Sequence, residues 1–516
     1  MKIRYPTWVR TFLAGALAAG LMTPAAHAGP HNDTLVVALP KALTTVDRLY
    51  SIQREGLILA ELTDDGLFGV NADTLEFEPL AAESYQWVGD TRLEVTLRDN
   101  VRFHDGSPLT AEDVVYTYEW VLNPASDTSR GPVIRGWLDS VEQTGPMSVA
   151  FNLTMPYPMA LRDMAISIPL RKYGTYHDDQ GEMRREQPHN GLGPYRITRF
   201  NIGRDIVLER FADYYAESPK AEASINNVIF RIIPDEGTQQ AELLSGGIDL
   251  MLDVPPDVAD NVSALPGVAR MQGNDIRIGY LTLDAGGFSN PNSPMTNLKV
   301  RQAINHAINR EAITRYLVRG SAEAIPYACH PRQFGCQADG PLYPYDPDKA
   351  RQLLAEAGYE NGFSFRLWAY RDKVIAESIV SDLKAVGLNV DLRYVKLNVF
   401  SKMRNDKQME AFFASYGGGG TADASASTGV HFTANSARNF SGDDALADTV
   451  LAAERTIHVE ERQHLYTTAL NRIAEQAYWV PMFSYSQNYL LTPALSLPVP
   501  EDGVPRLWQA TWRAQP

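Results

Sequence analysis

Apolar and polar positions recur with two different periods along the chain, which predicts both strands and helices. Residues 33–40, DTLVVALP, form a continuous apolar run of the length of a buried strand. Residues 92–98, RLEVTLR, alternate as a half-buried strand does, and residues 148–155 and 205–211 behave in the same way. Helical segments lie between such runs, so the pattern favours an α/β fold.

The helical segments carry start and stop signals. Thr110 is placed to cap a helix that ends before Pro124, and acidic residues follow it in the first turn. Residues 297–318 read as one long amphipathic helix, and residues 346–358 as a helix that starts at an Asp cap and stops at a glycine. Residues 372–395 predict a helix, a glycine stop and a strand. No repeat or long low-complexity linker separates these elements, so we expect closely packed domains.

A predicted strand, residues 409–416 (MEAFFASY), runs directly into four glycines, Gly417 to Gly420. Bare backbone at this point suits a phosphate cradle, a flexible linker or a ligand cleft. The sequence TADASASTGVHF that follows gives no clear helix, which weakens the phosphate interpretation, because phosphate cradles open a helix.

The first 28 residues have the three parts of a secretory signal. Basic residues precede Thr11–Met22, an apolar stretch of twelve residues, and Ala26–Ala28 (AHA) fits a cleavage site. A membrane span needs roughly 20 apolar residues, although an N-terminal anchor is the alternative. We expect cleavage after Ala28 and a mature protein in the periplasm.

Charge and length narrow the class of protein. The net charge is −15 over 516 residues, and removal of the basic signal makes it more negative. An acidic protein is a poor partner for nucleic acids and anionic membranes, so we expect neither. The length predicts two or three domains.

The two cysteines, Cys329 and Cys336, lie in the sequence CHPRQFGC. In an oxidising compartment this spacing favours a disulfide that closes a short loop. The alternative is a metal site that also uses His330, but zinc normally takes four ligands and no second Cys/His pair is near.

The chain contains no HExxH, CxxC, P-loop, GxSxG or GxGxxG motif, and its ten histidines are scattered. We therefore expect no enzyme, no metal and no cofactor. Acid/base sites of the glycosidase type leave little local signature, so a catalytic carboxylate pair stays open as an alternative.

Several motifs, in order, resemble the solute-binding proteins of peptide-type (dipeptide, oligopeptide and nickel, family 5) ABC transporters. The resemblance spans nearly all of the chain after the signal. It is carried by residues 97–118 (LRDNVRFHDGSPLTAEDVVYTY), 191–197 (GLGPYRI), 210–217 (RFADYYAE), 246–250 (GGIDL), 300–313 (VRQAINHAINREAI), 345–359 (YDPDKARQLLAEAGY), 382–392 (DLKAVGLNVDL) and 479–484 (WVPMFS).

The resemblance implies a type II periplasmic binding protein fold of the large cluster, with two lobes around a ligand cleft and two hinge crossings. The first lobe is then 29–270 plus 478–516, with an extra subdomain at about 66–189, and the second lobe is 271–477. It implies a monomer that captures a short peptide or peptide-like solute. The solute passes to an inner-membrane ABC permease with cytoplasmic ATPase subunits. The alternative cargo is a non-peptide solute: an opine, an oligosaccharide, a glutathione-like thiol, haem or a nickel chelate.

The same resemblance places the glycine run at the cleft. Peptide-binding relatives carry an aspartate there for the peptide's amino group, where this chain has Gly418 or Gly419, and Asp423 is the nearest acid. Tyr416 takes the aromatic position and Gly417 follows it. Bare glycines there favour a bulky, acidic or sugar-like ligand, and the alternative is a surface loop.

Further cleft candidates come from two other segments. Arg371 is a partner for a ligand carboxylate, Tyr370 can stack on the ligand, and Tyr485 follows the second hinge crossing. Exposed or core positions are the alternatives for these residues. His431 keeps a metal chelate open as cargo, although a structural histidine is favoured.

Overall fold

The computed structural model describes residues 29–71, 73–177, 183, 189–221, 223–417 and 421–514. The predicted signal sequence, residues 1–28, lies outside the described residues, and so do Gly418 and Gly419.

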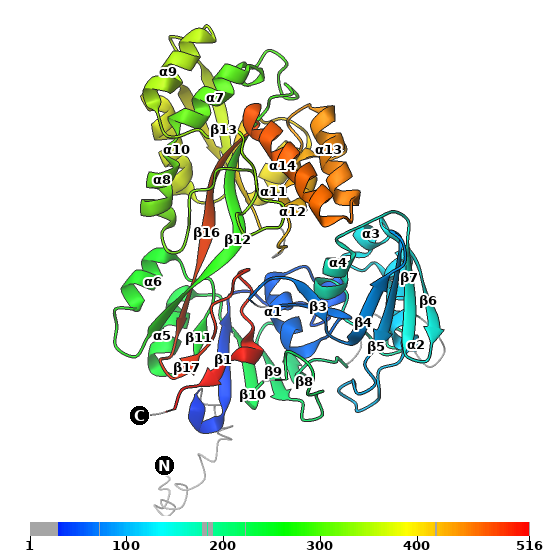
Figure 1. Cartoon of the computed structure of the whole chain (residues 1–516). Coiled ribbons are helices and arrows are strands. Elements are labelled where there is room, and N and C mark those ends of the chain that lie inside the picture. The colour runs from blue at the N-terminus through cyan, green and yellow to red at the C-terminus, as the bar shows by residue number, and fades with distance from the viewer. Residues whose placement is uncertain are drawn as a thin grey trace, which may run out of the picture.

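One sheet of ten strands runs through the molecule in the order β14-β13-β15-β12-β16-β11-β1-β10-β9-β8 (Figure 1). Its strands are β1 (Thr34–Leu39), β8 (Tyr195–Asn201), β9 (Asp205–Arg210), β10 (Asn227–Ile232), β11 (Leu250–Met251), β12 (Ala269–Leu283), β13 (Ser364–Ala369), β14 (Asn389–Tyr394), β15 (Ala411–Tyr416) and β16 (Trp479–Leu491). β12 and β16 are the longest of these strands and pair antiparallel along their length. They hold the two ends of the sheet together.

A separate antiparallel sheet has the order β4-β5-β7-β6. The strands outside the large sheet are β2 (Phe68–Val70), β3 (Phe77–Pro79), β4 (Ala82–Trp87), β5 (Arg92–Leu97), β6 (Leu138–Gly145), β7 (Ser148–Leu153), β17 (Leu495–Ser496) and β18 (Thr511–Trp512). The predicted strands at 33–40, 92–98, 148–155 and 205–211 therefore all form.

The helices are α1 (Arg54–Thr63), α2 (Ala111–Leu122), α3 (Gly131–Ile134), α4 (Ala160–Ile166), α5 (Glu236–Ser245), α6 (Pro256–Val262), α7 (Leu298–Ala307), α8 (Arg310–Ile313), α9 (Pro347–Glu356), α10 (Lys373–Ala385), α11 (Leu397–Asn405), α12 (Ser425–Phe432), α13 (Asp444–Arg455) and α14 (Val459–Glu475). Short 3₁₀ turns include η2 (Arg48–Tyr50) and η6 (Leu507–Gln509). Among the described residues, no helix has both the length and the apolar character that crossing a membrane requires.

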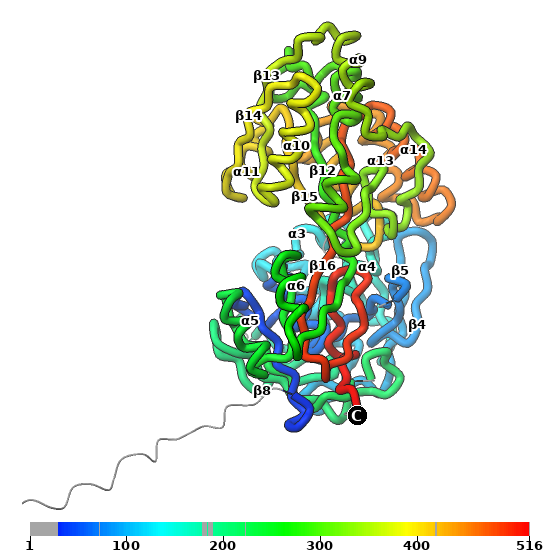
Figure 2. Tube along the Cα trace, turned by 90° about the vertical axis from the view of Figure 1, so that its left-hand side faces the viewer, coloured from blue at the N-terminus to red at the C-terminus, as the bar shows by residue number. Residues whose placement is uncertain are grey.

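The molecule has two lobes joined by β12 and β16, which confirms the predicted α/β, two-lobed fold (Figures 1 and 2). We call lower lobe the part with β1–β11, α1–α6 and the tail from β17 onward. We call upper lobe the part with β13–β15 and α7–α14. The lobes touch on both sides of the connecting strands: Arg162 Nε donates to Thr421 Oγ1 at 3.0 Å, and Arg319 Nη1 pairs with Asp260 Oδ2 at 2.9 Å.

Each lobe has its own apolar core. In the upper lobe, one core packs α7–α10 against one face of β13–β15, and another packs α11–α14 against the opposite face. In the lower lobe, cores lie on both faces of the sheet around β1 and β10, and a third fills the space between α2, α4 and the four-stranded sheet. Each lobe is therefore a packed body of its own, and β12 and β16 join the two.

Two local expectations were wrong. The helix predicted over 297–318 is interrupted at Ile308, where Asn309 caps a new helix with its side chain, and it ends in a π-helical turn at Thr314–Val318. A helix, α12, does follow the glycine run, although no helix was expected there. Its serines and threonines have low intrinsic helix propensity, so the buried face of α12 decides its conformation through packing.

Gly193, within the predicted GLGPY motif, packs directly on the end of α1. An added methyl group would lie 2.5 Å from Leu62 O and 2.6 Å from Asp64 N, so no side chain fits. We expect Gly193→Ala to lower the free energy of unfolding by about 1–3 kcal/mol through overpacking. Chemical denaturation measures the change.

Gly237 in α5 provides the control, because its nearest neighbour, Asp235 Oδ1, is 3.5 Å from the added methyl group. Gly237→Ala should be neutral or stabilise the protein by up to about 1 kcal/mol, since alanine favours the helix. Equal effects of the two substitutions would show that Gly193 is not sterically required.

Candidate functional site

A cavity of about 680 Å³ lies where the two lobes meet the connecting strands. Both lobes and both strands supply its walls. The lining residues are Lys41, Gln53, Arg54, Glu55 and Asp253–Pro256 from the lower lobe, Leu317, Val318, Arg371, Asp372 and Ile375 from the upper lobe, and Asp275, Arg277 and Tyr485–Asn488 from β12 and β16. A change in the angle between the lobes would therefore open or close this cavity.

Opposite charges are matched around the cavity. Each of its three parts, lower lobe, upper lobe and connecting strands, contributes one arginine–aspartate pair. The pairs are Arg54 Nη1–Asp253 Oδ2 at 2.6 Å, Arg371 Nε–Asp372 Oδ2 at 2.8 Å and Arg277 Nε–Asp275 Oδ2 at 3.4 Å. The cavity thus offers both hydrogen-bond donors and charged acceptors at short spacing.

Two of these aspartates adopt left-handed backbone conformations. The φ angle is 55° at Asp253, two residues after the end of β11, and 48° at Asp372, which precedes α10. Aspartate tolerates this conformation better than most residues, but it still costs energy, and such residues cluster at functional sites. Burial raises the pKa of Asp253, and the neighbouring Arg54 opposes that rise.

On the upper-lobe side, Arg371 lies between the ring of Tyr485 and the hydroxyl of Ser415. Its guanidinium carbon is 4.8 Å from the centre of the Tyr485 ring, and Nη1 donates to Ser415 Oγ at 2.7 Å. The Tyr485 hydroxyl donates to Asp372, and burial raises the pKa of Tyr485 well above its ordinary value. Two of the predicted ligand residues, Arg371 and Tyr485, are therefore brought together at the cavity wall.

Tyr416 and Gly417 lie at the end of β15, beside Arg277. An added methyl group at Gly417 would lie 3.3 Å from Arg277 Nη2, so Gly417 is in close contact with a residue that lines the cavity. The Tyr416 ring packs edge-on against His431 at 5.1 Å between ring centres, and Arg438 lies over it at 5.1 Å.

Tyr370 and Asp423 do not line this cavity. The Tyr370 ring packs against Phe400, with 4.7 Å between ring centres. Asp423 is only 5% exposed, pairs with Arg462 Nη2 at 2.8 Å and accepts a hydrogen bond from the Tyr466 hydroxyl at 3.2 Å. Its carboxylate therefore joins neighbouring segments of the upper lobe.

Cys329 and Cys336 form a disulfide, and the loop that it closes supports the segment after the glycine run. Phe334 N donates to Ala422 O at 2.9 Å, Ala424 N donates to Phe334 O at 2.8 Å, and Gln333 Nε2 donates to Thr421 O at 2.8 Å. This backbone pairing also holds Asp423 in the upper-lobe core.

The histidines considered as metal ligands have protein partners. Both ring nitrogens of His431 are engaged, with the Tyr280 hydroxyl and with Ser427 O, each at 2.8 Å. Burial, assisted by Arg438, lowers the pKa of His431 to about 3. His330 is buried, and its Nδ1 accepts a hydrogen bond from Arg332 N. Within the described part of the chain, no group of three or more His, Cys, Asp or Glu side chains is placed to hold a metal ion.

Several cavity residues were not singled out from the sequence. Asp275 and Arg277 lie in the segment expected to cross between the lobes, and this position was the available signal. Arg54 and Asp253 are 199 positions apart in the sequence, and nothing local marks them as a pair.

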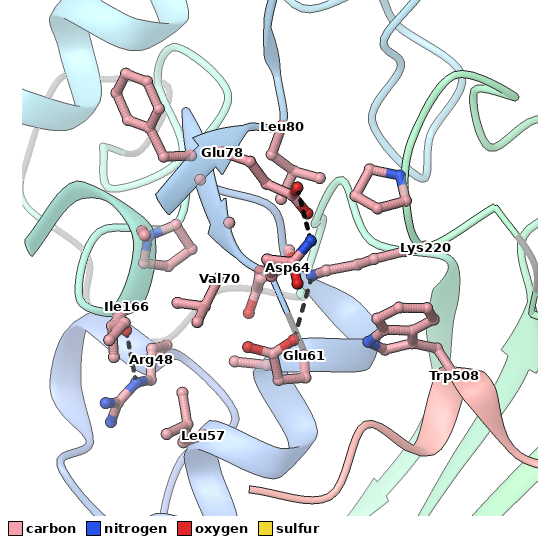
Figure 3. A pocket seen from close by; sticks show the side chains of 18 of the residues that line it. Arg48, Leu57, Glu61, Asp64, Val70, Glu78, Leu80, Ile166, Lys220 and Trp508 are labelled. Carbon is pink, nitrogen blue, oxygen red and sulfur yellow. Dashed lines mark hydrogen bonds and ion pairs between the residues drawn. The ribbon is translucent and has the colours of Figure 1, made fainter. Parts of the chain in front are cut away.

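A second, smaller pocket of about 260 Å³ lies entirely within the lower lobe (Figure 3). Lys220 reaches into it but is already bound by Asp65 Oδ1 at 3.0 Å and Asp64 O at 3.2 Å. Because α1, the β2–β3 hairpin and the tail at Trp508 line it, movement of the upper lobe would not enclose it. We therefore take the cavity between the lobes as the candidate site.

Comparison with known proteins gives consistent matches. The family model described as "Bacterial extracellular solute-binding proteins, family 5 Middle" matches residues 76–439. The glutathione-binding protein GsiB of Shigella flexneri is 25% identical over 490 residues, covering 91% of this chain and 92% of that protein.

Two solved structures have the same fold. HbpA2 from Haemophilus parasuis superposes with a TM-score of 0.81 at 22% identity, covering 93% of this chain and 100% of that one. A dipeptide-binding protein from Pseudoalteromonas sp. SM9913, in complex with Met-Leu, superposes with a TM-score of 0.75 at 20% identity and covers the same shares.

The buried pair of Asp423 and Arg462 leads to a stability prediction. Asp423→Ala would leave the guanidinium of Arg462, which is 7% exposed, without its carboxylate. Loss of one partner of a buried pair costs about 3–5 kcal/mol, so the midpoint of thermal unfolding should fall by several degrees. Asp348→Ala, at an ion pair whose carboxylate is 90% exposed, is the control and should change little. A small effect of Asp423→Ala on the thermal midpoint would contradict the structural role of this carboxylate.

Glu454 leads to a prediction about pH. Burial, with the nearby Asp423 carboxylate, raises the pKa of Glu454 from 4.5 to about 7, although Arg462 and Arg455 oppose the rise. The folded state therefore holds this proton at a pH where the unfolded state has lost it, and the free energy of unfolding should fall as the pH rises from about 4.5 to about 7.

Glu454→Gln should flatten that slope and raise the thermal midpoint at pH 8 relative to the unmodified protein. Thermal unfolding between pH 4.5 and pH 8 measures both effects. Glu360→Gln, at an exposed turn residue, should leave the profile unchanged. An unaltered slope in Glu454→Gln would contradict the assignment.

Proposed function

The chain belongs to family 5 of the bacterial extracellular solute-binding proteins, and from this membership we propose that it captures a short peptide or peptide-like solute for an ABC importer. The solute binds in the cavity between the lobes, and the closed form docks on the permease. The observation that carries the proposal is the cavity itself, because both lobes build it and it pairs arginines with aspartates.

A peptide carries an ammonium and a carboxylate, and each needs an opposite charge when it is buried. Arg371 with Asp372, and Arg54 with Asp253, offer one of each sign on opposite lobes. A zwitterion can exchange partners with these pairs and leave no buried charge unmatched. The relatives that bind glutathione and Met-Leu support a peptide-like solute.

Closure follows from the way the lobes are joined. We propose residues 29–270 and 478–516 as one lobe, with an extra subdomain at about 66–189, and residues 271–477 as the other. Bending of β12 and β16 at this boundary brings Arg371 toward Arg54 and buries the solute. As the lobes close, the solute replaces the water around the acidic and basic groups that line the cavity.

The cellular setting is part of the same proposal. A signal sequence cleaved after Ala28 delivers the protein to the periplasm as a monomer. There it presents the solute to an inner-membrane permease whose ATPase subunits lie in the cytoplasm. The disulfide of Cys329 and Cys336 suits an oxidising compartment.

Native mass spectrometry of protein made in a bacterial periplasm tests the proposed function. We expect a bound species whose mass matches a short peptide or a peptide-like molecule, and which is released on mild unfolding. Its fragmentation identifies the solute. A bound sugar, or an empty protein whose thermal midpoint is unmoved by a peptide library, would contradict the peptide assignment.

A further inference from the structure

Three arginines of the lower lobe meet on the face that it turns toward the upper lobe. Arg48 lies in η2, Arg130 directly precedes α3, and Arg162 lies in α4. Figure 1 shows α3 and α4 at the end of the lower lobe that faces α12 and α14. In a chain whose net charge is −15, a group of arginines in one place calls for a ligand or a partner.

Hydrogen bonds hold the three segments together. Ser129 N donates to Leu49 O at 2.8 Å, which joins the segments of Arg130 and Arg48. Arg48 Nε donates to Ile166 O of α4 at 3.4 Å, and the Arg48 side chain also lines one side of the lower-lobe pocket (Figure 3). Arg162 reaches across to Thr421 of the upper lobe. The cluster is thus fixed by the backbone and stands at the junction of the lobes.

Two of these arginines lack a carboxylate. Arg130 is half-buried, its Nε is enclosed without a hydrogen bond, and among the described residues its guanidinium has no ion pair. Arg48 is 6% exposed and donates only to backbone carbonyls in the described chain. Burial, with the charges of Arg130 and Arg162, lowers the pKa of Arg48 to about 10. The nearby carboxylates are paired elsewhere: Asp163 with Arg162 Nη1 at 2.6 Å, and Asp64 with Arg171. The three arginines of the cluster thus share one directly paired carboxylate, and buried cations normally have an anion beside them.

The end of β15 faces the cluster from the upper lobe. Arg162 Nε donates to Thr421 Oγ1 at 3.0 Å, which brings the cluster against the segment that follows the glycine run. Arg438 lies over the Tyr416 ring and forms no ion pair among the described residues, and Gly417 lies beside Arg277. Because Arg277 also lines the candidate cavity, the end of β15 lies between the cavity and the side of the junction where Arg162 contacts Thr421.

We propose that the solute carries a carboxylate beyond its chain ends, and that Arg130 and Arg48 bind this carboxylate against Tyr416 and Gly417. The inference rests on the proposed function and specifies it: the cargo is an acidic peptide or an acidic peptide-like molecule. The cavity holds the matched chain ends, and the arginines bind the extra negative charge through charge-assisted hydrogen bonds. The absence of a side chain at Gly417 leaves room for the solute to approach the backbone.

Matched tripeptides test this inference by isothermal titration calorimetry at pH 7. Ala-Glu-Ala and Ala-Gln-Ala differ by one carboxylate and have nearly the same size. We expect the unmodified protein to bind Ala-Glu-Ala about tenfold or more tightly than Ala-Gln-Ala, which is the range of a hydrogen bond to a charged group. In Arg130→Gln this preference should largely vanish, with the affinity for Ala-Gln-Ala little changed. Arg130→Lys, which keeps the charge but loses the planar donor group, should fall between the two.

Arg204→Gln is the control, because Arg204 is 83% exposed in a turn of the lower lobe, and it should keep the full preference. Equal binding of the two peptides by the unmodified protein, or an unchanged preference in Arg130→Gln, would overturn the inference while leaving peptide capture intact.

If neither peptide binds, the solute released from periplasmic protein is identified by mass spectrometry and titrated instead. A solute without an extra acidic group rejects the arginine site. An acidic solute that is not a peptide, and that binds Arg130→Gln more weakly, keeps the arginine site and rejects only the peptide assignment.

Discussion

The antiparallel pairing of β12 with β16 is the constraint on which the rest of the structure depends. These strands, of 15 and 13 residues, are the fourth and fifth of the ten-stranded sheet and the route by which the chain passes between the lobes. Their register shifts between Asp275 and Ile278 and again between Gly279 and Tyr280. A bulge leaves a residue outside the ladder, bends the strand and turns its side chains to a new direction.

The irregular part of the β12–β16 pairing lies at the candidate site, and there is a physical reason for this. The first shift leaves Ile276 and Arg277 out of the regular register, and the side chain of Arg277 lies both at the cavity and beside Gly417. Gly279 follows, where an added methyl group would lie 2.7 Å from the Phe483 ring. The irregular stretch of the β12–β16 pairing is therefore also the point at which charged groups face the space between the lobes.

Sequence reasoning found the elements that depend on neighbouring residues and missed what depends on distant ones. The strand at 33–40 and the helix at 110–124 follow from alternation, capping and burial patterns, and both form. The helix α12 was missed because its serines and threonines favour other conformations, and only packing against the upper-lobe core selects the helix. Arg371 and Tyr485 both line the cavity, and as ligand residues they stay a prediction. Asp423 lies elsewhere because the disulfide loop pairs with its backbone, a contact that no local pattern reveals.

The residues on either side of the glycine run have defined positions in the upper lobe. On one side, Tyr416 ends β15 in register with Ile278 of β12, and on the other, Thr421 is bound by Gln333 of the disulfide loop. Both flanks are therefore fixed to the upper-lobe framework, and Gly417 meets Arg277 at its first position. In the proposed site, the extra carboxylate of the solute would supply the negative charge that Arg48 and Arg130 lack as a direct partner among the described residues, and Gly417 has no side chain to stand in its way.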